Sequence, residues 1–171
     1  LIITYDSRTQ NILATYVVKK GVHPYTLKVL KMFVERLGYE RMLYKNDQEN
    51  PIKALMEELA KVTHVEFVAE ESKAYDSRSN GIIESHVQAF EKAFRTLRDA
   101  LESRLGRKLS DNHPALSWLA FHTAKNINRF RVRSDGKTAY QKWKGKPFRI
   151  PILEFGEFCF ALKANSVGRH K

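Results

Sequence analysis

A mixed α/β fold is predicted by three features of the sequence. Near the start, two short runs rich in β-branched and apolar residues flank a polar turn, which indicates an antiparallel hairpin. Segments with helical spacing then alternate with short strand-like runs, so helical crossovers are expected to join the later strands. In the middle of the chain, apolar residues recur at intervals of three and four, which is typical of a long amphipathic helix.

The hairpin and the first helix have clear local signals. Strands are expected at Leu1–Tyr5 and Ile12–Val18, with turn-forming residues between them. Asp6, at the corner of this hairpin, is explained by turn chemistry rather than by metal binding. Pro24 is expected to open the first helix and Gly38 to end it.

The next elements lead to the long helix. Strands are expected at Met42–Tyr44 and Val65–Val68, separated by a helix that starts at Pro51. The apolar stripe of the long helix consists of Ile83, Val87, Phe90, Phe94, Leu97 and Leu101. A further helix, with its cap at Ser110 or Asp111, is expected to run through Ile127.

The positive charge lies in the second half of the chain. The 171 residues carry a net charge of +11, yet the segment up to Glu84 holds 12 basic and 12 acidic residues. The remainder holds 18 basic and 7 acidic residues. An excess of this kind favours a polyanionic partner, most often nucleic acid, although a basic surface that only keeps the protein in solution is the simpler alternative.

Other bulk properties exclude some classes of protein. No apolar run has the length of a membrane span and no signal peptide is visible, so we expect no membrane association. Cys159 is the single cysteine, which excludes a disulfide within the chain and a cysteine-rich zinc site. We therefore expect an intracellular protein, nuclear if the host is a eukaryote.

Two acidic residues stand out by position. Glu84 lies in the first turns of the long helix beside its apolar stripe, and Asp47 follows the Met42–Tyr44 strand. Sites in open α/β sheets form at the carboxyl ends of the strands, where two carboxylates can bind a hard divalent cation. A helix-dipole role for Glu84 and a turn role for Asp47 are the alternatives.

The sequence from Tyr75 to Ser85, Y-D-S-R-S-N-G-I-I-E-S, resembles the last catalytic motif of retroviral and retrotransposon integrases, S-x-(N/Q)-G-x-x-E. In those enzymes the glutamate is the third acid of the D,D-35-E set, and 36 residues separate Asp47 from Glu84 here. The resemblance continues through Ile127-Asn128-Arg129 and Glu154-Phe155-Gly156, in the order found in copia-type elements.

The resemblance implies a ribonuclease H-like mixed sheet flanked by helices. That fold opens with three strands before its first helix, whereas only two are found here. The missing strand is the first, which carries the first catalytic Asp in the family, so we expect the chain to be an incomplete core. We expect the catalytic core at residues 1–131 and a basic tail at residues 132–171.

The resemblance also implies an activity and its cofactor. Integrases process DNA 3′ ends and join them to target DNA, with two divalent ions, Mg²⁺ or Mn²⁺, held by acids. Asp47 and Glu84 are the expected catalytic and metal-binding residues, and DNA and further copies of the chain are the expected partners. The residues expected to contact DNA are Tyr75, Asn80, Arg95, Arg98, Arg129, Arg131 and Lys144.

Three further expectations come from the residues alone. His86 is expected to be a solvated helix position, whereas Trp118 and Phe121, at helical spacing, are expected in the core rather than on a stacking surface.

The alternative to an integrase core is a non-catalytic DNA-binding remnant, or an adopted protein that uses only the basic half. A different ribonuclease H-like nuclease is disfavoured by the segments around Asn128 and Phe155.

Overall fold

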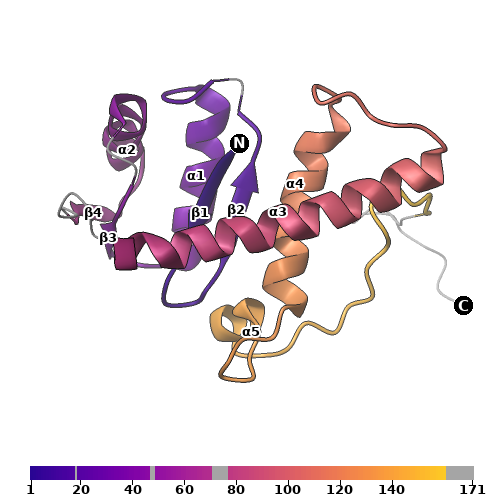
Figure 1. The fold of residues 1–171 in the computed structure, drawn as a ribbon. Coiled ribbons are helices and arrows are strands. Elements are labelled where there is room, and N and C mark those ends of the chain that lie inside the picture. Colours follow the sequence, from indigo (N-terminus) through magenta and orange to yellow (C-terminus); the bar gives the residue numbers. More distant parts are fainter. Residues whose placement is uncertain (18, 47–48, 71–76, 161–171) are drawn as a thin grey trace, which may run out of the picture.

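The computed structural model describes residues 1–17, 19–46, 49–70 and 77–160 of the chain. Short strands and longer helices alternate over the first half, and helices predominate in the second (Figure 1). The prediction of a mixed α/β fold is therefore confirmed at the level of class.

The N-terminal hairpin forms as predicted, with a shorter second strand. Strand β1 (Ile2–Tyr5) pairs antiparallel with β2 (Ile12–Thr15), and Tyr5 lies opposite Ile12. The Asp6 carboxylate closes the turn because it accepts hydrogen bonds from the backbone N–H and the hydroxyl of Thr9. The hydroxyl of Tyr39 also donates to this carboxylate at 3.0 Å, so Asp6 has the structural role that turn chemistry predicts.

A helix and a parallel strand pair follow the hairpin. Helix α1 (Pro24–Leu37) ends at Gly38, whose φ of 74° places it in the left-handed conformation that favours glycine. Strand β3 (Arg41–Tyr44) and β4 (Glu66–Ala69) pair in parallel across the helix between them, α2 (Asn50–Val62).

The four strands of the described chain form two separate pairs, not the single mixed sheet that the sequence suggested. Helix α4 (Ala115–Phe130) packs along β2, which closes that side of the hairpin. Within the described residues, no strand joins the two pairs.

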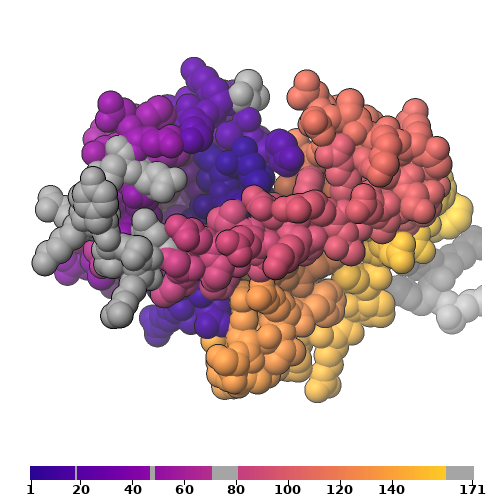
Figure 2. Space-filling view, in the orientation of Figure 1, coloured from indigo at the N-terminus to yellow at the C-terminus, as the bar shows by residue number. Residues whose placement is uncertain are grey.

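Helix α3 (Ser77–Leu105) is 29 residues long and crosses one face of the molecule as a continuous ridge (Figure 2). Helix α4 begins at Ala115, directly after Pro114, so the predicted cap at Ser110 or Asp111 is wrong. Instead, the Nδ1 atom of His113 accepts from the backbone N–H of Ala115 at 3.2 Å. Within the described ranges, no helix combines the length and apolarity needed to cross a bilayer.

The core lies on both faces of the hairpin because side chains alternate along β2. Ile12 and Ala14 pack with Phe90 of α3 and with apolar residues of α4. Leu13, between them, packs with α1 and α2 through a cluster that includes Leu30. Helices α3 and α1 are therefore on opposite faces of the hairpin.

A short unpredicted helix, α5 (Ala139–Lys144), follows α4. The hydroxyl of Thr138 accepts from the backbone of Gln141, whose side chain accepts in return from the backbone N–H of Thr138. The indole N–H of Trp143 donates to the backbone oxygen of Arg36 at 2.9 Å, so contacts cross the boundary expected at residue 131. The division into a core and a tail remains a prediction.

Candidate metal and nucleic-acid site

Glu84 lies on the second turn of α3, off the apolar stripe that holds the helix in place. Phe90 and Leu101 of that stripe are 1% and 4% exposed, which fixes the helix against the core. Glu84 is exposed, and within the described part of the chain its carboxylate makes no hydrogen bond or ion pair. Its oxygens therefore suit the needs of a hard divalent cation, which takes oxygen ligands.

The second predicted acid, Asp47, lies outside the described residues. Its flanking framework is present: β3 ends at Tyr44, which lies opposite Ala69 at the end of β4. Parallel strands bring their carboxyl ends to the same edge, and the chain leaves this edge towards Asp47 on one side and towards α3 on the other. A position of Asp47 close to Glu84 is a prediction from the sequence.

Among the residues that the structure describes, no three His, Cys, Asp or Glu side chains gather in a geometry suited to a metal ion. The predicted pair includes Asp47, which falls outside that set. The expectation of Mg²⁺ or Mn²⁺ at Asp47 and Glu84 is thus carried by the sequence and by the strand arrangement.

His86 is not the solvated position that the sequence suggested. Its ring lies 3.9 Å from that of Tyr5, centroid to centroid, at the end of β1. Its Nδ1 atom is 2.7 Å from the backbone oxygen of Ile82, and its Nε2 atom is 3.3 Å from a guanidinium nitrogen of Arg133. These contacts fit a neutral ring that donates at Nδ1 and accepts at Nε2.

Electrostatics around His86 agree with the neutral form. Burial is the main reason that the pKa of His86 lies below its usual range, with the charge of Arg133 acting in the same direction. Burial, followed by the charge of Arg131, also lowers the pKa of Arg133. This contact ties α3 to the segment after α4, across 47 positions of sequence.

The residues predicted to contact DNA fall into different environments. Tyr75 lies outside the described residues, as does the side chain of Asn80. Arg95 is exposed and lies 3.3 Å from Glu91, one turn earlier on α3. Arg131 is exposed after the end of α4. The contacts of these residues with DNA stay predictions.

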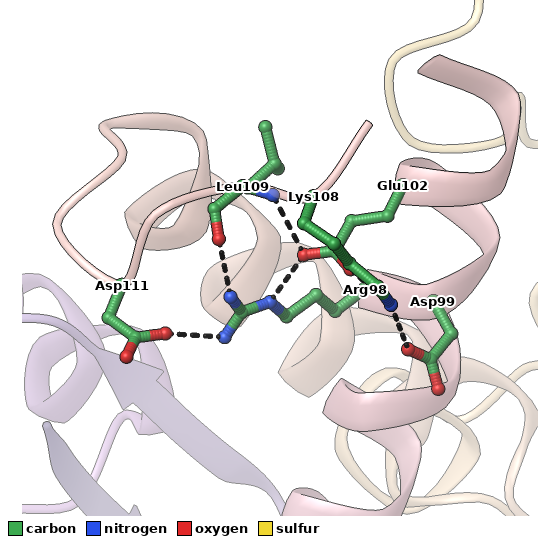
Figure 3. A network of polar contacts seen from close by, with 6 residues as sticks. All are labelled: Arg98, Asp99, Glu102, Lys108, Leu109 and Asp111. Carbon is green, nitrogen blue, oxygen red and sulfur yellow. Dashed lines mark hydrogen bonds and ion pairs between the residues drawn. The ribbon is translucent and has the colours of Figure 1, made fainter. Parts of the chain in front are cut away.

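Arg98 belongs to a polar network between α3 and the chain that follows it (Figure 3). Its Nε atom donates to Glu102 at 2.8 Å, and its terminal nitrogens donate to Asp111 at 2.9 Å and to the backbone oxygen of Leu109 at 2.6 Å. Lys108 lies 2.8 Å from the other oxygen of Glu102. The guanidinium is therefore committed to the fold, and its contact with DNA remains a prediction.

The segment around Phe155 packs against the C-terminal end of α3. Arg104 of α3 donates to the backbone oxygen of Phe155 at 2.5 Å and pairs with Glu154 at 3.2 Å. Phe155 packs near Leu101, and Gly156 adopts a φ of 78° beside it. The Glu154-Phe155-Gly156 motif thus has a packing role in this protein.

Four cations lie over aromatic rings near α1, α4 and α5. Arg36 and Lys144 lie 4.1 and 3.7 Å from the centroid of Trp143. Lys125 lies 4.3 Å from the ring centroid of Phe121, and Arg129 lies 4.3 Å from that of Phe148.

Of these four cations, Arg129 and Lys144 are among the residues that the sequence predicts to contact DNA, whereas Arg36 and Lys125 are not. Lys125 had a signal in the sequence, because it lies four residues before Arg129 and this spacing puts both on one face of α4. Arg36 had none, because its aromatic partner is 107 positions away.

Trp118 corrects a prediction. Its side chain is 71% exposed on α4, so it is not a core residue, whereas Phe121 is partly buried against the α1–α2 cluster as expected. The two positions differ because Phe121 points towards the hairpin and Trp118 does not.

In comparisons with known proteins, no family model and no curated sequence matches the chain.

Proposed function

We propose that the chain is the catalytic core of an integrase from a retrotransposon of the copia type, with a ribonuclease H-like fold. Its activity would be metal-dependent processing of DNA 3′ ends and their transfer to target DNA. One observation carries most of the proposal. Glu84 is exposed, has no hydrogen bond or ion pair within the described residues, and lies on the helix that follows a parallel strand pair, with the neighbouring strand leading to Asp47. The spacing and order of these acids match the integrase pattern.

The fold part of the proposal accounts for the two separate strand pairs. In a ribonuclease H-like sheet the hairpin and the parallel pair belong together, and a strand between β1 and β3 would unite them. The first strand of the integrase family, which brings the first Asp, is the strand that would do so. The first acid of the proposed site, which would act with Asp47 and Glu84, is accordingly expected from that strand.

Asp47 and Glu84 are the residues that would hold the divalent ions. Bound Mg²⁺ or Mn²⁺ activates the attacking oxygen and stabilises the leaving oxygen in this type of phosphoryl transfer. Glu84 is suited to this because α3 is anchored by Phe90 and Leu101, so the carboxylate is presented from a fixed helix. Basic residues of the second half would hold the DNA backbone without reading its sequence.

A second candidate is a DNA-binding protein without chemistry. The observation that favours it is the set of cations at Arg36, Lys125, Arg129 and Lys144, which needs no acidic residue in order to bind phosphate. The two candidates differ only in whether Glu84 matters for covalent chemistry.

Strand transfer on a duplex that carries element ends tests the choice, with Mg²⁺ or Mn²⁺ added. The chain is compared with the chain extended by the native sequence that precedes it, and each is compared with its Glu84→Gln variant. Glu91→Gln, also an exposed acid on α3, is the control. We expect activity in the extended chain, a loss of at least 100-fold with Glu84→Gln, and little change with Glu91→Gln. Binding without activity in every form would favour the second candidate.

A further inference from the structure

A small pocket lies where α1, α4 and α5 meet, on the side of the hairpin away from α3. Its walls include Asn11, Phe33, Arg36, Phe121, Lys125 and Trp143. Ile12 and Leu13 of β2 also line it. Its α1 residues, Phe33 and Arg36, belong to the helix that packs on the face of the hairpin opposite to α3. The name α1–α4–α5 pocket is used for three of these residues, Arg36, Lys125 and Trp143, together with the neighbouring Arg129.

The cations of the pocket are held in place by aromatic rings. Trp143 is fixed because its indole N–H donates to the backbone oxygen of Arg36 at 2.9 Å. The guanidinium of the same arginine lies 4.1 Å from the indole centroid, and the ammonium of Lys125 lies 4.3 Å from the ring of Phe121. A cation held over a ring loses little further freedom when it binds an anion.

Among the described residues, these cations have no acidic partners. Within the described part of the chain, Arg36, Lys125 and Arg129 form no ion pair with a carboxylate, whereas Lys31, also on α1, pairs with Glu35 at 3.6 Å. Burial, followed by the charge of Arg129, lowers the pKa of both Arg36 and Lys125. The three cations therefore repel one another in a partly buried place, and a bound anion would relieve that repulsion.

We propose that the α1–α4–α5 pocket binds a backbone phosphate of double-stranded nucleic acid, as a second contact on the face of the hairpin opposite to α3. The inference rests on the proposed function as far as the partner is DNA, and it adds Arg36, Lys125 and Trp143 to the residues that bind it. A phosphate fits better than a base, because the cations already occupy positions over the Trp143 and Phe121 rings on which a base would stack. The planar guanidinium of Arg36 suits two phosphate oxygens.

The test measures binding of a fluorescein-labelled 20-base-pair duplex as a function of salt, in EDTA so that metal chemistry plays no part. A triple variant, Arg36→Gln, Lys125→Gln and Arg129→Gln, removes the three charges of the pocket. The matched control is Lys31→Gln, Arg41→Gln and Lys61→Gln, which removes three exposed cations that are each paired with a glutamate and are not expected to contact DNA.

Each lost phosphate contact lowers the slope of log K against log salt by about one. We expect the pocket triple to lower the slope by about one, because one phosphate contact is lost, and the control triple to leave the slope almost unchanged. Equal slopes for the two triples would overturn the proposal. Glu84→Gln is expected to leave the slope unchanged, so a failed pocket and a failed integrase site give different results.

A second measurement does not depend on the triple variant folding. Trp118→Phe leaves Trp143 as the one tryptophan, and acrylamide, a neutral quencher, then reports access to the pocket. We expect saturating duplex to lower the quenching constant of Trp143 at least twofold, and a charge-conserving variant, Arg36→Lys with Lys125→Arg, to keep both this protection and the salt slope. Quenching that the duplex leaves unchanged would show that the pocket remains open when DNA is bound, and the proposal would be wrong.

Discussion

At the scale of single residues, Glu102 shows how a charged group becomes part of the core of this protein. Its side chain is 4% exposed, yet it receives hydrogen bonds from Lys108, Arg98 and the backbone N–H of Leu109 (Figure 3). These donors, with Lys108 the strongest, lower the pKa of Glu102 to about 2. A buried carboxylate with this many donors stabilises the loop between α3 and α4 only while it is ionised.

The sign of the resulting pH dependence follows from the lowered pKa. Because the folded-state pKa lies below the ordinary value of 4.5, Glu102 contributes its full stabilisation above about pH 4.5 and loses it as the pH falls towards about 2. We expect the difference in unfolding free energy between the natural chain and Glu102→Gln to shrink across that window. Urea denaturation at several pH values measures it.

Glu91→Gln is the control for this titration, since Glu91 is exposed and its single ion pair with Arg95 is of the kind that contributes little. If the difference between the natural chain and Glu102→Gln were the same at pH 3 and pH 6, the network around Glu102 would have no electrostatic role.

At the scale of elements, α5 depends on its cap. The helix is six residues long, too short to be stable by itself, and Thr138 and Gln141 satisfy backbone N–H groups at its start. We expect Thr138→Ala to lower the unfolding free energy by about 1 kcal/mol and Thr138→Ser to lower it by much less. Thr96→Ala, at an exposed position in the middle of α3, is the control and is expected to change stability little.

Thr138→Ala also tests whether α5 holds the side chain of Trp143 in place. Trp143 is on this helix and its indole is bonded to α1, so a loosened cap should raise the acrylamide quenching of Trp143 in the Trp118→Phe background. A loss of stability without that change would show that the cap holds the segment but not the indole.

Elements with local signals could be predicted from the sequence. Pro24 and Gly38 mark the ends of α1 by their own backbone geometry. The cap of α4 could not be placed at Ser110 or Asp111, because the carboxylate of Asp111 pairs with Arg98 and the helix begins after Pro114. Helix α5 is not predicted, although Thr138 and Gln141 have the spacing of a capping box, because its six residues are too few to show an apolar stripe.

The candidate sites divide in the same way. Glu84 could be named as a candidate from the sequence because its motif is contiguous and its helix has a clear apolar stripe. The contacts of His86 with Tyr5 and Arg133, and of Arg36 with Trp143, join distant segments, so they depend on the tertiary fold and leave no local pattern. The proposed DNA contacts therefore changed most once the fold was known.

At the scale of the whole molecule, the hairpin couples its two sides. Ile12 and Ala14 belong to the cluster with Phe90, and Leu13 belongs to the cluster with α1 and α2. A loss of packing on one face of the hairpin should therefore lower the stability of the other face, because adjacent residues of one strand cannot unfold separately. The molecule is expected to unfold as one cooperative unit across the hairpin.

Phe90→Ala tests this coupling. Phe90 is 1% exposed, so its truncation is expected to cost about 3–5 kcal/mol, most of it as cavity and lost burial. In the Trp118→Phe background, far-ultraviolet circular dichroism reports the helices and Trp143 fluorescence reports the α1–α5 side. The substitution Trp118→Phe is expected to change stability little, since Trp118 is 71% exposed. We expect Phe90→Ala to shift both urea transitions to the same lower midpoint, because the hairpin transmits the loss from the α3 face to the α1 face. A shift in circular dichroism with an unchanged Trp143 transition would mean that the two faces unfold independently, and α3 with Glu84 would then be free to detach while the α1–α4–α5 pocket stayed intact.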